Sequence, residues 1–98
     1  MNKVILVGNL TRDPEYRTTP SGAAVCNAVQ RRFANQQGVR EADFINCVAW
    51  RQQADFVHRF FTKGRKIGVV GSIQTRTYDA QDGSKRYVTE VVCDECEF

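Results

Sequence analysis

A chain of 98 residues is long enough for one small domain with a modest core, and a hydrophobic fraction of 42% argues against disorder. No run of about 18 apolar residues occurs and no signal peptide precedes the first expected strand, so we expect no membrane contact and a cytoplasmic location. The formal net charge is only +3, but residues 1–93 hold all 14 basic residues against 8 of the 11 acidic ones. This distribution favours a polyanionic partner, although an ordinary solvated surface remains the alternative.

Four cysteines in a chain without a secretory signal argue against a disulfide scaffold. Cys93 and Cys96 have the spacing of a C-x-x-C motif, but their acidic neighbours would raise the thiol pKa. In a regular strand these two side chains would point to opposite faces and could not share a metal ion. We therefore expect small buried hydrophobic residues here, with no metal and no cofactor.

Residues 3–10 (KVILVGNL) are expected to form the first strand, and both of its faces are apolar. Val4, Leu6 and Leu10 share one face, while Ile5 and Val7 share the other. A domain of this size can cover only one face with its own core. A second copy of the chain is the expected cover for the other.

Residues 11–22 carry two prolines and a P-S-G sequence, which predict a loop. Residues 23–33 are expected to form the second strand, and residues 34–40 (ANQQGVR) a polar hairpin loop.

The third strand, within residues 40–51 (READFINCVAWR), carries the strongest functional signal. Alternation places Ile45, Cys47 and Ala49 on a core face, and Phe44, Asn46, Val48 and Trp50 on the opposite face. Two aromatic rings on an open face flanked by arginines suit single-stranded nucleic acid, because rings stack on bases and guanidinium groups contact phosphates. The alternative is that a helix or another subunit covers this face too.

Residues 51–62 have helical spacing, with Ala54, Val57 and Phe61 on one stripe, and Lys63–Gly64 form a typical helix end. Residues 66–76 are expected to form the fourth strand, with Ile67, Val69 and Ile73 in phase.

Residues 77–85 predict a hairpin around Asp82–Gly83, and residues 86–98 a fifth strand. The predicted class is all-β with one helix. Five strands with a helix between the third and fourth match the OB-fold, a five-stranded Greek-key barrel that binds oligomers across its strand face.

Asp55, on the same helix as the only histidine, His58, suggests acid–base chemistry as one alternative. We disfavour it because no nucleophile lies nearby in sequence and helical histidines are mostly surface or packing residues. We therefore expect no enzyme. A protein-interaction module on the same fold would need fewer exposed aromatic rings. An RNA-binding OB domain stays open, since stacking and phosphate contacts serve both nucleic acids.

The segments NKVILVGNLTRDPE, TPSGAAV, READFINCVAWR, QTRTY and DGSKRYVTEVV resemble the bacterial single-stranded DNA-binding protein family in order and spacing, over almost the whole chain. The resemblance implies one OB-fold domain over residues 1–98 that binds and protects single-stranded DNA in replication, recombination and repair. It also implies a homotetramer built as a dimer of dimers, located with the bacterial nucleoid.

Carried over from that family, the base-stacking positions are Phe33, Phe44, Trp50 and Tyr78. The basic positions implied along the DNA path are Arg31, Arg32, Arg51, Arg76, Arg86 and Lys3, with Arg40 and Lys85 as secondary candidates.

The chain departs from the family pattern in two places. The second strand is about three residues short between Asn27 and Ala28, so either the strand bulges there or residues are missing from the sequence. An odd deletion would invert the faces on one side of it. The acidic tail that recruits replication and repair proteins in this family is not expected within residues 1–98, so such partners would require a longer form.

Overall fold

The computed structural model describes residues 1–20 and 22–98, including their side chains apart from those of residues 19, 23 and 25–27. The elements in chain order are β1 (Val4–Leu10), β2 (Glu15–Thr19), β3 (Gly22–Ala34), β4 (Arg40–Trp50), α1 (Arg51–Phe60), β5 (Lys66–Asp79) and β6 (Lys85–Glu97). Within the described residues, no helix is long and apolar enough to cross a membrane.

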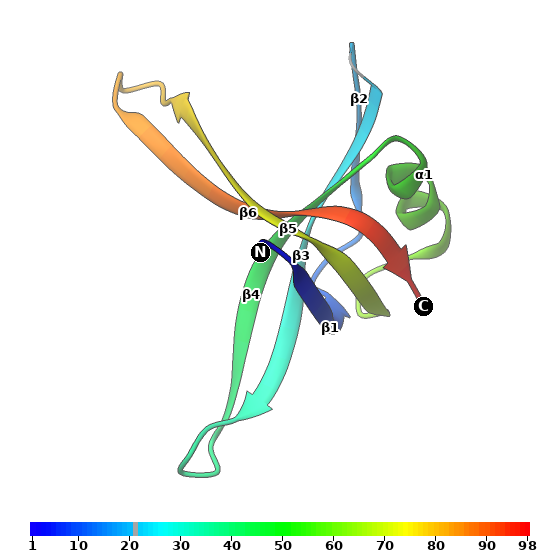
Figure 1. Cartoon of the computed structure of the whole chain (residues 1–98), viewed down its shortest axis with the longest axis vertical. Helices are drawn as coiled ribbons and strands as arrows, with labels where there is room; N and C mark the ends of the chain where they lie inside the picture. The colour runs from blue at the N-terminus through cyan, green and yellow to red at the C-terminus, as the bar shows by residue number, and fades with distance from the viewer. Residues whose placement is uncertain (21) are drawn as a thin grey trace.

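Five of the strands close into a barrel (Figure 1), in the spatial order β1-β5-β6-β4-β3. β1 closes the ring, because it pairs with β5 along Val4–Asn9 and with β3 at Asn9 and Leu10. The pairing of β4 with β6 is parallel, whereas the other pairings are antiparallel. This closed five-stranded arrangement, with α1 between β4 and β5, confirms the predicted OB-fold.

β2 corrects the sequence-based prediction, which placed its residues in a loop. Glu15–Thr19 instead forms a hairpin with the N-terminal part of β3, outside the closed ring. Tyr and Thr favour strands, and β3 is 13 residues long, so its end offers a free edge to pair with. Pro14 and Pro20 correctly indicate turns on either side of β2. Because they lie only six residues apart, the same pattern also assigns the residues between them to the loop.

The core fills the interior of the barrel, and α1 covers one side of it. Ala54, Val57 and Phe61 are almost fully buried, as their helical spacing predicts. α1 ends at Phe60 and not at Thr62, although the backbone N–H of Phe61 still donates to the Val57 carbonyl at 3.0 Å. The buried residues of the main cluster are Leu6, Leu10, Val29, Cys47, Ala49, Ala54, Val57, Phe61, Ile67, Val69, Val91, Cys93 and Cys96.

A β-bulge in β6 brings Cys93 and Cys96 to the same side, so the prediction that they face opposite ways is wrong. Gly71 pairs with Cys93 while Val70 pairs with Glu95, which leaves Asp94 as an extra residue that shifts the alternation by one. Both thiols are buried, and contacts with the Cys47 and Cys96 thiols, together with burial, raise the pKa of Cys93. Within the described residues, no group of three His, Cys, Asp or Glu is arranged to hold a metal ion.

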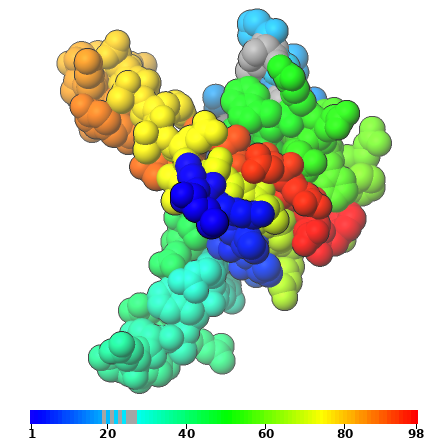
Figure 2. Space-filling model, viewed as in Figure 1, coloured from blue at the N-terminus to red at the C-terminus, as the bar shows by residue number. Residues whose placement is uncertain are grey.

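Two hairpins extend beyond the barrel as arms, and Figure 2 shows the β3–β4 arm in cyan and green and the β5–β6 arm in yellow and orange. The radius of gyration, 14.5 Å, exceeds the about 12.6 Å typical of a compact chain of this length because of these arms. Ile73 keeps the phase predicted with Ile67 and Val69, but it is 48% exposed and lies beyond Gly71, where the pairing of β5 with β1 ends. The arms therefore offer surface on both faces.

The hydrogen bonds of the two hairpin turns close both arms tightly. The Asn35 side-chain oxygen accepts from the backbone N–H groups of Gln37 and Val39, at 3.0 Å each. In the other turn, Asp82 accepts from Ser84, and Gly83 has a φ of 83°, as the predicted Asp–Gly hairpin requires.

Gly71 provides a test of the β5–β6 bulge. A Cβ at this position would lie 2.1 Å from the backbone oxygen of Val92, so Gly71→Ala must open the paired strands. We expect a loss of about 1–3 kcal/mol or more in the free energy of unfolding, measured by urea denaturation. Gly68→Ala is the matched control, because its nearest contact is the flexible Glu97 side chain at 3.1 Å. Equal stability of the two variants would contradict the bulge geometry.

Candidate nucleic-acid interface

Phe44 and Trp50 lie on the outer face of β4, as the alternation predicts. They pair with Gln30 and Ala24 of β3, and their exposed fractions are 66% and 41%. Val48 keeps the predicted phase with Phe44 and Trp50, because the register of β3 with β4 runs without a shift. Only 6% of Val48 is exposed, so the expectation that this face is open along its whole length is wrong at this position.

Phe44 forms one wall of an open groove of about 510 Å³, which we call the Phe44 groove. This volume is typical of sites for ligands of nucleotide size. The groove brings together the predicted residues Arg32 and Phe44, and it adds Lys63, which the sequence analysis interpreted only as part of a helix end. The lining residues are Asn9, Leu10, Thr11, Gln30, Arg32, Phe44, Lys63 and Gly64.

Phe33 lies on the other face of the β3–β4 arm from Phe44. Phe33 pairs with Glu41 and Arg31 with Asp43, in phase with the core-facing Val29, whereas Phe44 pairs with Gln30. The ring of Phe33 is half-buried under the Arg31 guanidinium, which is 4.6 Å from the ring centroid. The structure therefore does not bring all four predicted aromatic rings onto one face.

The β5–β6 arm gathers the predicted residues Arg76, Tyr78 and Arg86 on one face. Tyr78 pairs directly with Arg86, and the Arg76 guanidinium lies 5.9 Å from the Tyr78 ring centroid. Tyr78 is 48% exposed, which leaves room for a stacked base. The opposite face carries Tyr87, an exposed ring that the sequence analysis did not select and whose alternation with Arg86 could have revealed it.

Three of the predicted arginines form ion pairs across strands or turns. Arg31 contacts Asp43 at 2.7 Å, Arg76 contacts Glu90 at 3.1 Å, and Arg86 contacts Asp82 at 3.5 Å. Surface pairs of this kind contribute about 0–1 kcal/mol, so a phosphate could replace the carboxylate at little cost.

The remaining predicted cations form no ion pair with the described residues: Arg32, Arg40, Arg51, Lys3 and Lys85. Arg51 begins α1 with a φ of 53° and lies against Gly22, next to Trp50. Lys3 precedes β1, Arg40 begins β4 at the tip of its arm, and Lys85 begins β6. Arg32 lines the Phe44 groove, and Arg32 and Arg40 line a second open groove with the half-buried ring of Phe33.

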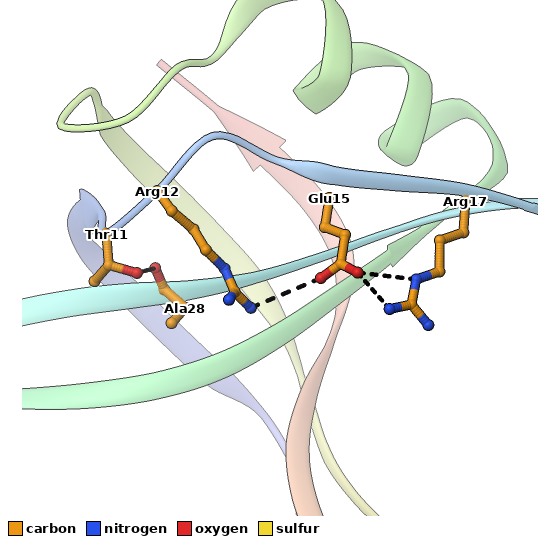
Figure 3. A network of polar contacts seen from close by, with 5 residues as sticks. All are labelled: Thr11, Arg12, Glu15, Arg17 and Ala28. Atoms are coloured by element: carbon orange, nitrogen blue, oxygen red, sulfur yellow. Dashed lines mark hydrogen bonds and ion pairs between the residues drawn. The ribbon is translucent and has the colours of Figure 1, made fainter.

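Two polar networks hold β2 in place. In Figure 3, Glu15 lies between Arg12 and Arg17. The hydrogen bond and the charge of Arg17, with a smaller effect from the charge of Arg12, lower the pKa of the Glu15 carboxyl. The Thr11 hydroxyl donates to the Ala28 carbonyl at 3.2 Å, which attaches the start of the loop between β1 and β2 to β3. The root of the hairpin is therefore fixed on both sides.

The second network attaches β2 to α1 and accounts for the two helical residues considered for acid–base chemistry. The Tyr16 hydroxyl donates to Asp55 at 2.9 Å, and the Tyr16 ring stacks on His58 with centroids 4.4 Å apart. This hydrogen bond raises the pKa of Tyr16 above its usual value of 10.0. Asp55 and His58 thus hold the hairpin, which is a structural role.

All 98 residues match the sequence model of a protein family, described as the single-strand binding protein family. The chain belongs to this family. Proteins of the single-strand binding family are non-enzymatic.

Curated relatives agree with this membership. Single-stranded DNA-binding protein 1 of Staphylococcus aureus (strain COL) is 56% identical over 101 residues, covering 100% of this chain and 60% of the relative. The single-stranded DNA-binding protein of Bacillus cereus is 57% identical, covering 100% of this chain and 59% of the relative. Single-stranded DNA-binding protein 1 of Lactococcus lactis is 59% identical over 97 residues, covering 96% and 65%. The chain therefore spans about 60% of the length of such relatives.

The alignment also bears on the short second strand. It runs over 101 positions with the Staphylococcus aureus relative, whereas the chain has 98 residues, so three positions have no counterpart here. The backbone register of β3 with β4 runs without a shift from Ala24↔Trp50 to Ala34↔Arg40, which excludes a bulge between these two strands, the first of the two alternatives. The side chains of Cys26 and Asn27 lie outside the described residues.

The Tyr16 network predicts a pH dependence. Because the folded pKa of Tyr16 is raised, its contribution to stability is present below pH 10 and is lost as the pH rises through the folded value. In an ultraviolet titration, the tyrosinate signal of Tyr16 is the one that the Tyr16→Phe variant lacks. We expect this signal to appear at a higher pH than that of an ordinary tyrosine. Asp55→Asn removes the charge of the acceptor and should lower that midpoint. An identical midpoint with and without the Asp55 carboxylate would contradict the network.

Proposed function

We propose that this chain is a single OB-fold domain, residues 1–98, that binds and protects single-stranded DNA without sequence preference. The domain would act in replication, recombination and repair. It would catalyse no reaction and need no cofactor. Its location would be the bacterial cytoplasm, with the nucleoid DNA. The observation that carries the proposal is an exposed Phe44 ring in one groove with Arg32 and Lys63, which form no ion pair with the described residues, in a chain of this family.

The chemistry of that surface favours unpaired bases. A base that stacks on Phe44, Trp50 or Tyr78 contributes about 1–3 kcal/mol, and every base has a face for stacking, so no sequence preference is needed. Bases inside a duplex cannot reach a ring on the flank of a barrel without unpairing. The β3–β4 surface and the β5–β6 hairpin correspond to the face and loops with which OB-folds bind oligonucleotides.

Paired arginines are expected to contribute less than unpaired ones. A phosphate that binds Arg31, Arg76 or Arg86 must first replace Asp43, Glu90 or Asp82. Arg32 has no such competitor among the described residues.

Self-association is supported by β1. Ile5 and Val7 point outward with exposed fractions of 73% and 53%, and among the described residues β3 pairs with β1 only at Asn9 and Leu10. An apolar face beside a free strand edge suits pairing with a second copy. The family resemblance extends this dimer to a homotetramer, a dimer of dimers. Recruitment of replication and repair proteins is proposed only for a longer form with an acidic tail.

Titration with oligothymidylate tests the proposed function. Trp50 is the only tryptophan, so a stacked base should quench its emission strongly. We expect duplex of equal length to bind far more weakly at about 150 mM salt, and the log–log salt slope to gain about −0.7 for each phosphate contact. Equal affinity for duplex and single strand would overturn the proposal. Tighter binding of oligouridylate would favour the RNA-binding alternative.

Val7→Glu tests the proposed assembly. A charge on the outward face of β1 should dissociate the oligomer, while the unmutated chain of 11.1 kDa should sediment as a multiple of that mass. Val39→Glu is the matched control, since Val39 is 56% exposed but lies in the turn of the β3–β4 arm. A monomeric unmutated chain at micromolar concentration would contradict the assembly.

A further inference from the structure

The turn between α1 and β5 carries Lys63 into the Phe44 groove, and its backbone is fixed to the end of β1. Gly64 donates to the Leu10 carbonyl at 2.8 Å, and the Asn9 side chain donates to the Gly64 carbonyl at 3.0 Å. Leu10 donates in turn to the Arg65 carbonyl at 3.0 Å. The turn is therefore an integral part of the groove wall.

The backbone N–H of Lys63 itself is bound by a different element. It donates to a carboxylate oxygen of Asp13, in the loop between β1 and β2, at 2.8 Å. The Asp13 carboxylate forms no ion pair with the Lys63 ammonium group within the described residues. Asp13 thus holds the backbone of Lys63 and leaves its charged end available to the groove.

Two cations line the groove together with its aromatic ring. Arg32 and Lys63 line the same groove as Phe44, which is 66% exposed. Within the described residues, neither cation has a carboxylate partner that would compete with a phosphate.

We propose that Lys63 binds a backbone phosphate of the strand whose base stacks on Phe44, and that Asp13 is the residue that positions Lys63. This inference rests on the proposed binding of single-stranded DNA. The Asp13 carboxylate would then favour DNA binding by holding Lys63, although its negative charge alone would repel the DNA.

The sign of the effect of Asp13 separates positioning from simple electrostatics. Without a positioning role, Asp13→Ala removes a negative charge near the DNA and should strengthen binding. With that role, Asp13→Ala loses the hydrogen bond and weakens binding. Asp13→Asn keeps an acceptor oxygen and removes the charge, so it should bind at least as tightly as the unmutated chain.

The experiment measures the affinity of a short oligothymidylate between 50 and 300 mM salt for the unmutated chain and its variants. Lys63→Ala should lower the salt slope by about 0.7, which corresponds to about fivefold weaker binding at 0.1 M salt. Asp13→Ala should bind about twofold to fivefold more weakly. The double variant should bind no more weakly than Lys63→Ala, because both changes remove one contact.

Arg59→Ala is the matched control for the loss of a positive charge, since Arg59 lies on the exposed face of α1 and lines no part of the Phe44 groove. It should leave the salt slope nearly unchanged, and thermal unfolding should show each variant folded. Asp13→Ala that binds as tightly as or more tightly than the unmutated chain would overturn the positioning role. An unchanged slope for Lys63→Ala would overturn the phosphate contact. Failure of the unmutated chain to bind at all would instead refute the proposed function.

Discussion

Closure of the barrel through β1 is the constraint on which the rest of the structure depends. Once β1 joins β5 to β3, the five strands of the ring commit their inner faces to the core wherever they lie within the ring, and Leu6, Leu10 and Val29 help to fill it. A ligand can then bind only to the outer faces of the strands and to the arms that leave the ring. Phe44 and Trp50 are available because β4 turns them outward, and Tyr78 because β5 extends beyond the barrel.

Much of this arrangement follows from local patterns in the sequence. The period of two around Phe44 predicts which face of β4 is open, and helical spacing predicts the burial of Ala54 and Val57. The order of strands and helix was sufficient to predict the closed barrel. The faces of β4 and α1 depend on short-range periodicity, which the sequence displays directly, whereas the barrel is predicted by matching the order of elements to a known fold.

The failures arise where pairing between distant segments decides the outcome. The bulge at Asp94 depends on the register of β6 against β5, and no local pattern encodes it. β2 exists because β3 is long enough to offer an edge. Phe33 and Phe44 face opposite ways because Phe44 pairs with Gln30, and Phe33 lies an odd number of positions from Gln30 along β3.

The pairing of charges also depends on contacts between distant segments. The sequence indicates a basic body but not which cations are free, because Arg31 and Asp43 are 12 residues apart and meet only across the hairpin. Arg76 and Arg86, on the face of Tyr78, each form an ion pair, whereas Arg32 and Lys63 in the Phe44 groove form none with the part of the chain that the structure describes. Lys63 joins the groove only through the fold, since its turn packs against the end of β1.

A crystal structure of the chain with a short oligothymidylate tests the central claim most directly, namely that the outer face of the β3–β4 ribbon is the DNA surface. The account predicts bases stacked on Phe44 and Trp50, with a phosphate in the groove between Arg32 and Lys63. A strand that instead follows the opposite faces, past Phe33 and Tyr87, while the Phe44 groove stays empty, would contradict it.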